Sequence, residues 1–166
     1  MKALLTAAAL VAAAPLTAQE YAPAEPAMRA EIVAAVDAIF AALRNPDKTV
    51  LATMMLPDGV ISVLDKTGPG APVERTIPVA KHLENWAKSP PALDEHMIYM
   101  AVLVSGKEAQ VSGPYRFTVG GQTTHCGVNV LSLVKTESGW RLGNTAFTMV
   151  PPSECEILGA PEAPAK

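Results

Sequence analysis

This sequence contains little charge, few aromatic residues and almost no cysteine. Of its 166 residues, 17% are charged, 5% are aromatic and two are cysteines. It has no run of basic residues and no interleaving of basic with aromatic residues, which argues against nucleic acid as a partner. It also lacks a phosphate-binding loop, a G-x-S-x-G elbow and a dinucleotide fingerprint, so it carries none of these nucleotide-binding or hydrolase signatures.

The apolar run at the start of the chain is short for a membrane span. Met-Lys is followed by LLTAAALVAAAPLTA, which predicts a secretory signal peptide over residues 1–18, cleaved after Ala18. A bilayer span needs ~20 apolar residues, and a retained anchor is the alternative. No cysteine follows the cleavage point to take a lipid. We therefore expect a periplasmic or secreted protein with no membrane contact after cleavage.

The two cysteines are Cys126 and Cys155. In an exported chain an even pair of cysteines is most simply a disulfide. The alternative is a reactive thiol at Cys126, which would need a neighbouring base and a lowered pKa.

The middle of the chain has the length and patterning of one domain. We expect a linker over 19–26, a folded domain over 27–155 and a flexible tail over 156–166, because Pro and Ala dominate both ends. Apolar residues recur at helical spacing from Met28 to Leu43. A short second helix is expected at 47–55, and a third is expected to open at Thr76-Ile77-Pro78 and run to Lys88.

After Glu95 the hydrophobic period changes from helical to alternating. The segments HMIYMAVLV, AQVSGPYRF, THCGVNVLSLVK and GWRLGNTAFTMV read as four strands, and an earlier strand is expected at VISVLD. Their short connections indicate an antiparallel meander. The predicted class is therefore α+β, with three N-terminal helices packed on a strongly curved, mainly antiparallel, cone-like sheet.

This order resembles the nuclear transport factor 2-like superfamily, which includes ketosteroid isomerase, scytalone dehydratase and polyketide-cyclase-like proteins. The resemblance covers about residues 27–150, and its most specific part is GPYRFTVGGQTTHCGVNVLSLVKTESGWRLGNTAF, which looks like an exported bacterial branch of the superfamily. It implies a cone-shaped domain, in some members an enzyme and in others a binding module.

Alternation along the strands suggests which polar side chains enter the cone. His125 shares a face with Asn129, whereas Cys126 points to the opposite face, so a Cys–His dyad between these neighbours is disfavoured. We expect the following residues to converge on an apolar pocket: His125 and Tyr115 as possible catalytic groups, and Asn129, Asn144, His82, Trp86 and Tyr99 as ligand contacts. For each of them a purely structural role is the alternative.

Known chemistries of the superfamily need more than these residues provide. Isomerase chemistry needs a carboxylate base, and none of Asp58, Asp65, Asp94 and Glu95 falls on the inward face predicted here. For dehydratase-like chemistry, only His125 and Tyr115 are plausible catalytic groups. The three histidines lack metal-ligand spacing, so we expect no metal and no cofactor.

Three functions stay open at this level. The first is an exported domain that binds a small apolar or amphipathic molecule. The second is a lyase, isomerase or hydrolase using His125 as acid–base, which a carboxylate hydrogen-bonded to His125 would favour. The third is a homodimeric interaction module, which would have a filled cone and an apolar outer sheet face at Val128, Val130 and Val134.

Overall fold

The computed structural model describes residues 20–88 and 92–162, so the predicted signal peptide lies outside the described residues. The helices are α1 (Pro26–Arg44), α2 (Thr49–Met54), α3 (Val79–Trp86) and the short 3-10 helix η1 (Pro152–Glu154). The strands are β1 (Ala22–Pro23), β2 (Val60–Asp65), β3 (Val73–Pro78), β4 (Leu93–Met97), β5 (Ala101–Ser105), β6 (Glu108–Val119), β7 (Gln122–Thr136) and β8 (Gly139–Met149).

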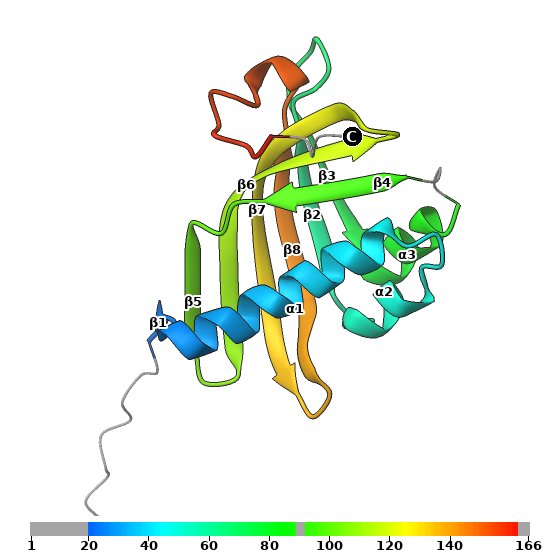
Figure 1. Cartoon of the computed structure of the whole chain (residues 1–166). Helices are drawn as coiled ribbons and strands as arrows, with labels where there is room; N and C mark the ends of the chain where they lie inside the picture. The colour runs from blue at the N-terminus through cyan, green and yellow to red at the C-terminus, as the bar shows by residue number, and fades with distance from the viewer. Residues whose placement is uncertain (1–19, 89–91, 163–166) are drawn as a thin grey trace, which may run out of the picture.

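The strands form one curved sheet in the order β1-β5-β6-β7-β8-β2-β3, with β4 paired to β6 off this path. Every pairing is antiparallel except that of β2 with β8. Helix α1 crosses the concave side of the sheet, and α2 and α3 lie beyond the C-terminal end of α1 (Figure 1). The predicted α+β class with three helices on a curved sheet is confirmed.

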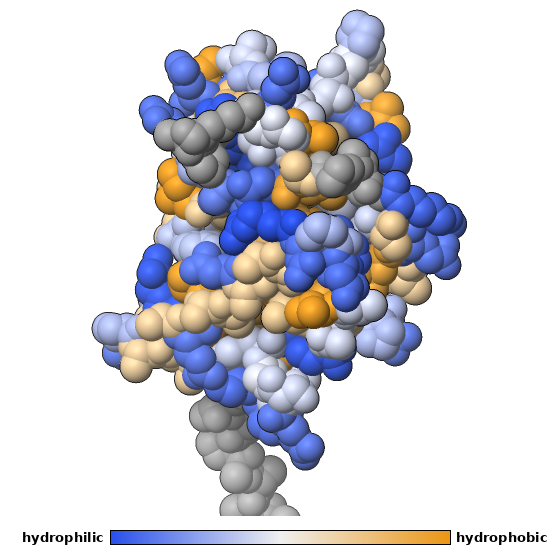
Figure 2. Space-filling model, turned by 45° about the vertical axis from the view of Figure 1, so that its right-hand side comes forward, coloured by the Kyte–Doolittle hydropathy of each residue, from blue (hydrophilic) through white to orange (hydrophobic). Residues whose placement is uncertain are grey.

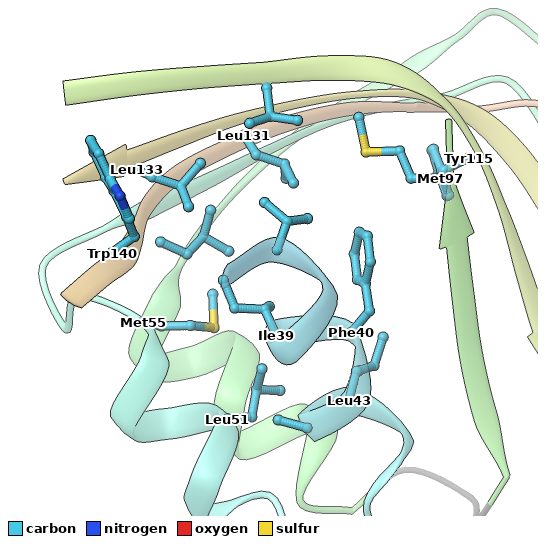
Figure 3. Packing of buried hydrophobic residues seen from close by; sticks show 14 of the residues in the cluster. Ile39, Phe40, Leu43, Leu51, Met55, Met97, Tyr115, Leu131, Leu133 and Trp140 are labelled. Atoms are coloured by element: carbon cyan, nitrogen blue, oxygen red, sulfur yellow. The ribbon is translucent and has the colours of Figure 1, made fainter. Parts of the chain in front are cut away.

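Helix α1 packs on the sheet because its apolar residues form one stripe. Ile32 and Val36 are fully buried, and Ile39, Phe40 and Leu43 are nearly so. Burying each such side chain stabilises the fold by roughly 1.5–3 kcal/mol relative to exposure. Figure 3 shows side chains of α1 and α2 pointing toward Leu131 and Leu133 of the sheet. The core therefore lies between the helices and the concave face.

The start of the third helix differs from the prediction. Thr76 and Pro78 belong to strand β3, and α3 begins only at Val79, without a threonine cap. Strand β3 is the last strand of the sheet, where a proline without an N–H does not interrupt a ladder. The extended run therefore continues through Pro78 before the helix begins.

The predicted first meander strand is two strands, β4 and β5, separated at Ile98–Met100. Across from this break lies Gly113, whose absent Cβ would stand 1.8 Å from the Ile98 carbonyl oxygen. The Ile98 and Met100 amides still donate to the Pro114 and Ser112 carbonyls of β6, at 3.0 Å each. Because Gly113 has no side chain, the segment Ile98–Met100 can bend close to β6. The bend gives β4 a direction different from that of β5.

Both ends of the described chain make contacts with the domain. β1 pairs with β5, within the segment expected as a linker. The predicted disulfide joins Cys126 to Cys155, with the two Cα atoms 5.5 Å apart, and Leu158 and Ala160 pack beside it. The domain boundaries themselves stay a prediction.

No helix among the described residues is long and apolar enough to cross a bilayer. On the face in Figure 2, hydrophilic and hydrophobic residues are interspersed.

Candidate functional site

A cavity of about 190 Å³ lies between the helices and the concave face of the sheet. Its lining is mainly aliphatic and aromatic, with contributions from all three main helices and from β2, β4, β6, β7 and β8. Its polar or polar-tipped lining residues, Trp86 aside, are His82, Glu95, Tyr115, His125, Asn129 and Thr145. Among the residues that the structure describes, no lysine and no arginine lines the cavity.

The size of the cavity limits what it can hold. Sites for drug-sized ligands span ~300–1,000 Å³, so a cavity of about 190 Å³ is smaller than such a site. An apolar cavity of ~150 Å³ is large enough for benzene. A cavity of about 190 Å³ therefore suits a molecule built around one ring.

His125 enters the cavity from β7, and Cys126 points away, as strand alternation predicts. His125 pairs across the sheet with Phe117, and their rings stack with centroids 4.9 Å apart. One ring nitrogen, Nδ1, lies 3.0 Å from the Thr124 hydroxyl. Burial lowers the pKa of His125 to about 4, so the imidazole is neutral at pH 7.

His82 and Trp86, both predicted contacts, line the cavity from α3. The Trp86 indole N–H donates to His82 Nε2. The Trp86 ring is tilted against that of Phe117, with centroids 5.8 Å apart, and Phe117 in turn stacks on His125. Burial lowers the pKa of His82 to about 4, so His82 is neutral as well. These rings form an aromatic wall.

Tyr115 is buried and borders the cavity, but its hydroxyl is already engaged. It donates a hydrogen bond of 2.8 Å to the Thr148 carbonyl. Burial raises the pKa of Tyr115, which keeps the phenol protonated. The ring is therefore part of the wall, and its hydroxyl proton is not directed at a ligand.

The sequence interpretation left no carboxylate on the inward face, and the structure corrects this. Glu95 lies within β4, pairs with the inward-facing Phe117 and lines the cavity. Asn129, as predicted an inward residue, donates through Nδ2 to Glu95 Oε1 at 2.6 Å. The alternation of buried Leu93 and Met97 around Glu95 is the signal that could have revealed this face.

The environment of Glu95 favours its protonated form. Burial raises the pKa of Glu95 to about 7, with a smaller increase from Asp94, while the hydrogen bond from Asn129 opposes the shift. Both the carboxylic acid and the carboxylate are therefore populated near pH 7.

Asn144, predicted to reach the cone, does not line the cavity. Leu131 of β7 pairs with Thr145 and Leu133 pairs with Leu142, so β8 carries one extra residue in this stretch. Such a bulge reverses the alternation beyond it. Asn144 is exposed and accepts a 2.9 Å hydrogen bond from the Val60 amide, whereas Thr145 lines the cavity.

Tyr99, another predicted contact, also lies outside the main cavity. Its hydroxyl donates to Asp37 of α1, and both residues border a separate pocket of about 160 Å³ with Arg44 and His96. The kink after β4 places Tyr99 outside the main cavity. Glu95 lines both this pocket and the cavity, so it stands between them.

Among the described residues, no group of three or more His, Cys, Asp or Glu side chains is arranged to hold a metal ion.

A helix lying across a curved, mainly antiparallel sheet, with a cavity between them, defines a class of fold. Comparison with solved structures identifies that class. The chain has the nuclear transport factor 2-like fold. No family model and no curated protein matches the sequence.

Three of the similar solved structures illustrate the sequence identity, TM-score and coverage of these matches. An NTF2-like protein from Shewanella baltica is 11% identical with a TM-score of 0.56, covering 74% of this chain and 94% of that one. A proposed NTF2-like dehydratase from Streptomyces avermitilis is 19% identical with a TM-score of 0.57, covering 73% and 94%. An NTF2-like protein with a cystatin-like fold from Novosphingobium aromaticivorans is 15% identical with a TM-score of 0.55, covering 78% and 87%.

Proposed function

We propose that this chain is an exported domain that binds a small, largely apolar molecule in the cavity under α1. The observation that carries the proposal is a cavity of about 190 Å³, lined by apolar and aromatic side chains and by a few polar groups. A concave apolar site with few convergent polar groups is the usual form of a small-molecule site.

The polar groups indicate how such a molecule would be oriented. Glu95 presents a carboxyl group fixed by Asn129, and His125 presents a neutral imidazole fixed at Nδ1 by Thr124. Both groups hydrogen-bond without introducing a permanent charge, which suits an uncharged ligand.

Export is supported by the N-terminal pattern and by the disulfide between Cys126 and Cys155. Disulfides persist in oxidising compartments and are rare in the cytosol. The periplasm or the extracellular space is therefore the proposed location.

A second candidate function is acid–base catalysis on the bound molecule, with Glu95 as the acid–base group. The hydrogen bonding described for the His125 ring involves the Thr124 hydroxyl and no carboxylate, so the proposed role of His125 as acid–base loses its main support. Glu95 has a pKa of about 7 inside an apolar cavity, and a pKa near the working pH is what proton transfer needs. Lyase and isomerase reactions are the classes that such a group would serve.

The proposal of a homodimeric module has weaker support. It requires a filled cone, whereas the cone holds a cavity. Val128 and Val130 on the outer face are 37% and 36% exposed, and Val134 is partly buried. Dimerisation through this face stays a prediction.

Native mass spectrometry of the protein isolated from the periplasm tests the proposed function. We expect an additional small-molecule mass on the wild type, and loss of that mass in Leu131→Trp, which fills the cavity. Val130→Trp is the matched control, because it places the same side chain on the opposite face of β7. Absence of any bound mass from the wild type, together with failure to take up added acetophenone or cumene, would refute the proposal.

A further inference from the structure

We propose that Glu95 binds a weakly basic ring nitrogen of the bound molecule, which is therefore an uncharged single-ring heterocycle of the pyridine or imidazole class. The proposal rests on the proposed binding function and specifies the ligand of the same cavity. Three features of the cavity support it: the second carboxyl oxygen of Glu95, the charges around that carboxyl and the aromatic wall.

One oxygen of the Glu95 carboxyl is accessible from the cavity. Asn129 donates to Oε1 at 2.6 Å, and Oε2 has no hydrogen-bond partner among the described residues. The described polar atoms that lack both a partner and accessible surface are Trp140 Nε1, Arg141 Nε and Thr145 Oγ1, so Oε2 keeps accessible surface. Asn129 lines the cavity and not the neighbouring polar pocket, so the carboxyl that it holds points into the cavity.

The surroundings of Glu95 supply no cation that pairs with it. None of the ion pairs among the described residues includes Glu95. The adjacent Asp94 engages the nearby basic side chains, because Arg44 Nη1 lies 3.0 Å and His96 Nε2 lies 2.8 Å from its carboxyl oxygens. A buried carboxyl without a cation needs either its own proton or a partner that donates one.

A weakly basic nitrogen suits both forms of this carboxyl. When Glu95 holds its proton, the Oε2–H group donates to the lone pair of the nitrogen. When the proton moves, the O–H bond breaks, an N–H bond forms, and the carboxylate accepts from the cationic ring; no other reactant is needed. Hydrogen bonds between ionised partners are roughly twice as strong as neutral ones. A ketone oxygen is too weak a base to take the proton, so it is limited to the neutral bond.

The charge of the cavity argues against ligands that are permanently charged. An anion would meet ionised Glu95 and, among the described residues, no lysine or arginine of the lining. A permanent cation would lose its hydration on entry, which is costly. A weak base enters uncharged and becomes charged only beside Glu95. Burial raises the pKa of Glu95 to about 7, close to the ~6.5 of an imidazole in water, so the two groups compete evenly for the proton.

The aromatic wall favours a flat ring. Phe117 and His125 stack with centroids 4.9 Å apart, and the other aromatic side chains of the lining are Phe40, Trp86, Tyr115 and Phe147. Aromatic rings stack on an uncharged ring and attract a cationic one through their faces. Both forms of a weakly basic heterocycle are therefore accommodated, in a cavity of about 190 Å³ that fits one ring.

Cumene and para-isopropylpyridine form a matched pair of probes, because they have the same shape and differ in one ring atom. Isothermal titration calorimetry compares both probes on the wild type, on Glu95→Gln and on Asp37→Asn. Glu95→Gln keeps an oxygen for the Asn129 hydrogen bond and removes the transferable proton. Asp37→Asn makes the same change in the neighbouring pocket, outside the cavity, and keeps an acceptor for the Tyr99 hydroxyl.

The measured quantity is the affinity for para-isopropylpyridine relative to that for cumene. We expect this ratio to be at least about fivefold lower in Glu95→Gln than in the wild type and in Asp37→Asn, because an amide forms only a neutral hydrogen bond. The same ratio in all three proteins, or an equal fall in both variants, would overturn the inference and leave the proposed function intact. Binding of neither probe by the wild type would overturn the inference and count against the proposed function.

A nitrogen NMR spectrum of isotope-labelled para-isopropylpyridine bound to the wild type does not depend on the folding of any variant. The resonance of a pyridine nitrogen moves when the nitrogen accepts a hydrogen bond, and moves further in the same direction when it is protonated. We expect the bound signal to be displaced from that of the free base in an apolar solvent toward that of the pyridinium ion. A bound signal at the position of the free base would overturn the inference.

Discussion

Asn129 donates a hydrogen bond of 2.6 Å to the carboxyl of Glu95, joining the centre of β7 to β4 across the inner face of the sheet. The two residues are 34 positions apart in the sequence. Their contact puts an ionisable group with a raised pKa into an otherwise apolar cavity.

The pH dependence of stability should reveal Glu95. Its pKa is about 7 in the folded protein, against ~4.3 for an exposed glutamate. The folded state therefore holds the proton more tightly, and the resulting stability is fully present below pH ~4.3 and is lost as the pH rises to 7. We expect the melting temperature of Glu95→Gln minus that of the wild type to increase as the pH rises across this range. Above this range the difference should keep its increased value.

Melting curves of the two proteins between about pH 4 and about pH 8 measure this effect. Because His82 and His125 are present in both proteins, their titration cancels in the difference. A melting-temperature difference that does not change with pH would contradict the assignment of a raised pKa to Glu95.

Removing the His125 ring should weaken binding more than folding. His125→Ala deletes the ring that stacks on Phe117 and borders the cavity, so retention of the co-purified molecule should be lost while the fold stays intact. Asn144→Ala is the control, because Asn144 lies on the outside and contacts the Val60 amide. Loss of melting temperature in proportion to loss of binding in His125→Ala would make His125 a structural residue.

The disulfide should stabilise the domain without shaping the cavity directly. Cys126 and Cys155 are 29 residues apart, and closing a loop of this size is worth roughly 3–4 kcal/mol in the chain-entropy model. The double variant Cys126→Ala/Cys155→Ala should lose about that much free energy of unfolding in urea. Two alkylatable thiols in the native exported protein, seen by intact mass, would contradict the bridge.

The kink between β4 and β5 should depend on Gly113. An added Cβ there would lie 1.8 Å from the Ile98 carbonyl oxygen, and overpacking of this kind costs about 1–3 kcal/mol or more. Gly113→Ala should therefore lower the free energy of unfolding and disturb Glu95, which β4 carries. Gly68→Ala is the control, since its Cβ would meet nothing within 4 Å. Equal stability of the two variants would argue against the close approach.

The sequence predicts the parts of the site that follow regular alternation. His125 and Asn129 on one face of β7, with Cys126 on the other, follow from a period of two in a strand without interruption between them. The stripe of α1 follows equally from the helical period. These patterns depend only on local geometry.

The misplaced residues lie next to interruptions of that geometry. Because of the bulge in β8, Thr145 lines the cavity in place of Asn144. Because of the kink opposite Gly113, Tyr99 lies outside the cavity. Glu95 was missed because β4 begins at Leu93, before the apparent change of period. Bulges and kinks depend on the partner strand, so they cannot be predicted from the sequence of a single segment.

The most direct measurement of the central claim is an NMR titration of the methyl groups with cumene. The account predicts shift changes concentrated at Ile39, Leu131 and Met149, which line the cavity, with Val128 and Val130 on the outer face unchanged. Shift changes at the outer valines alone, or none at a saturating probe concentration, would contradict a ligand-binding cavity under α1.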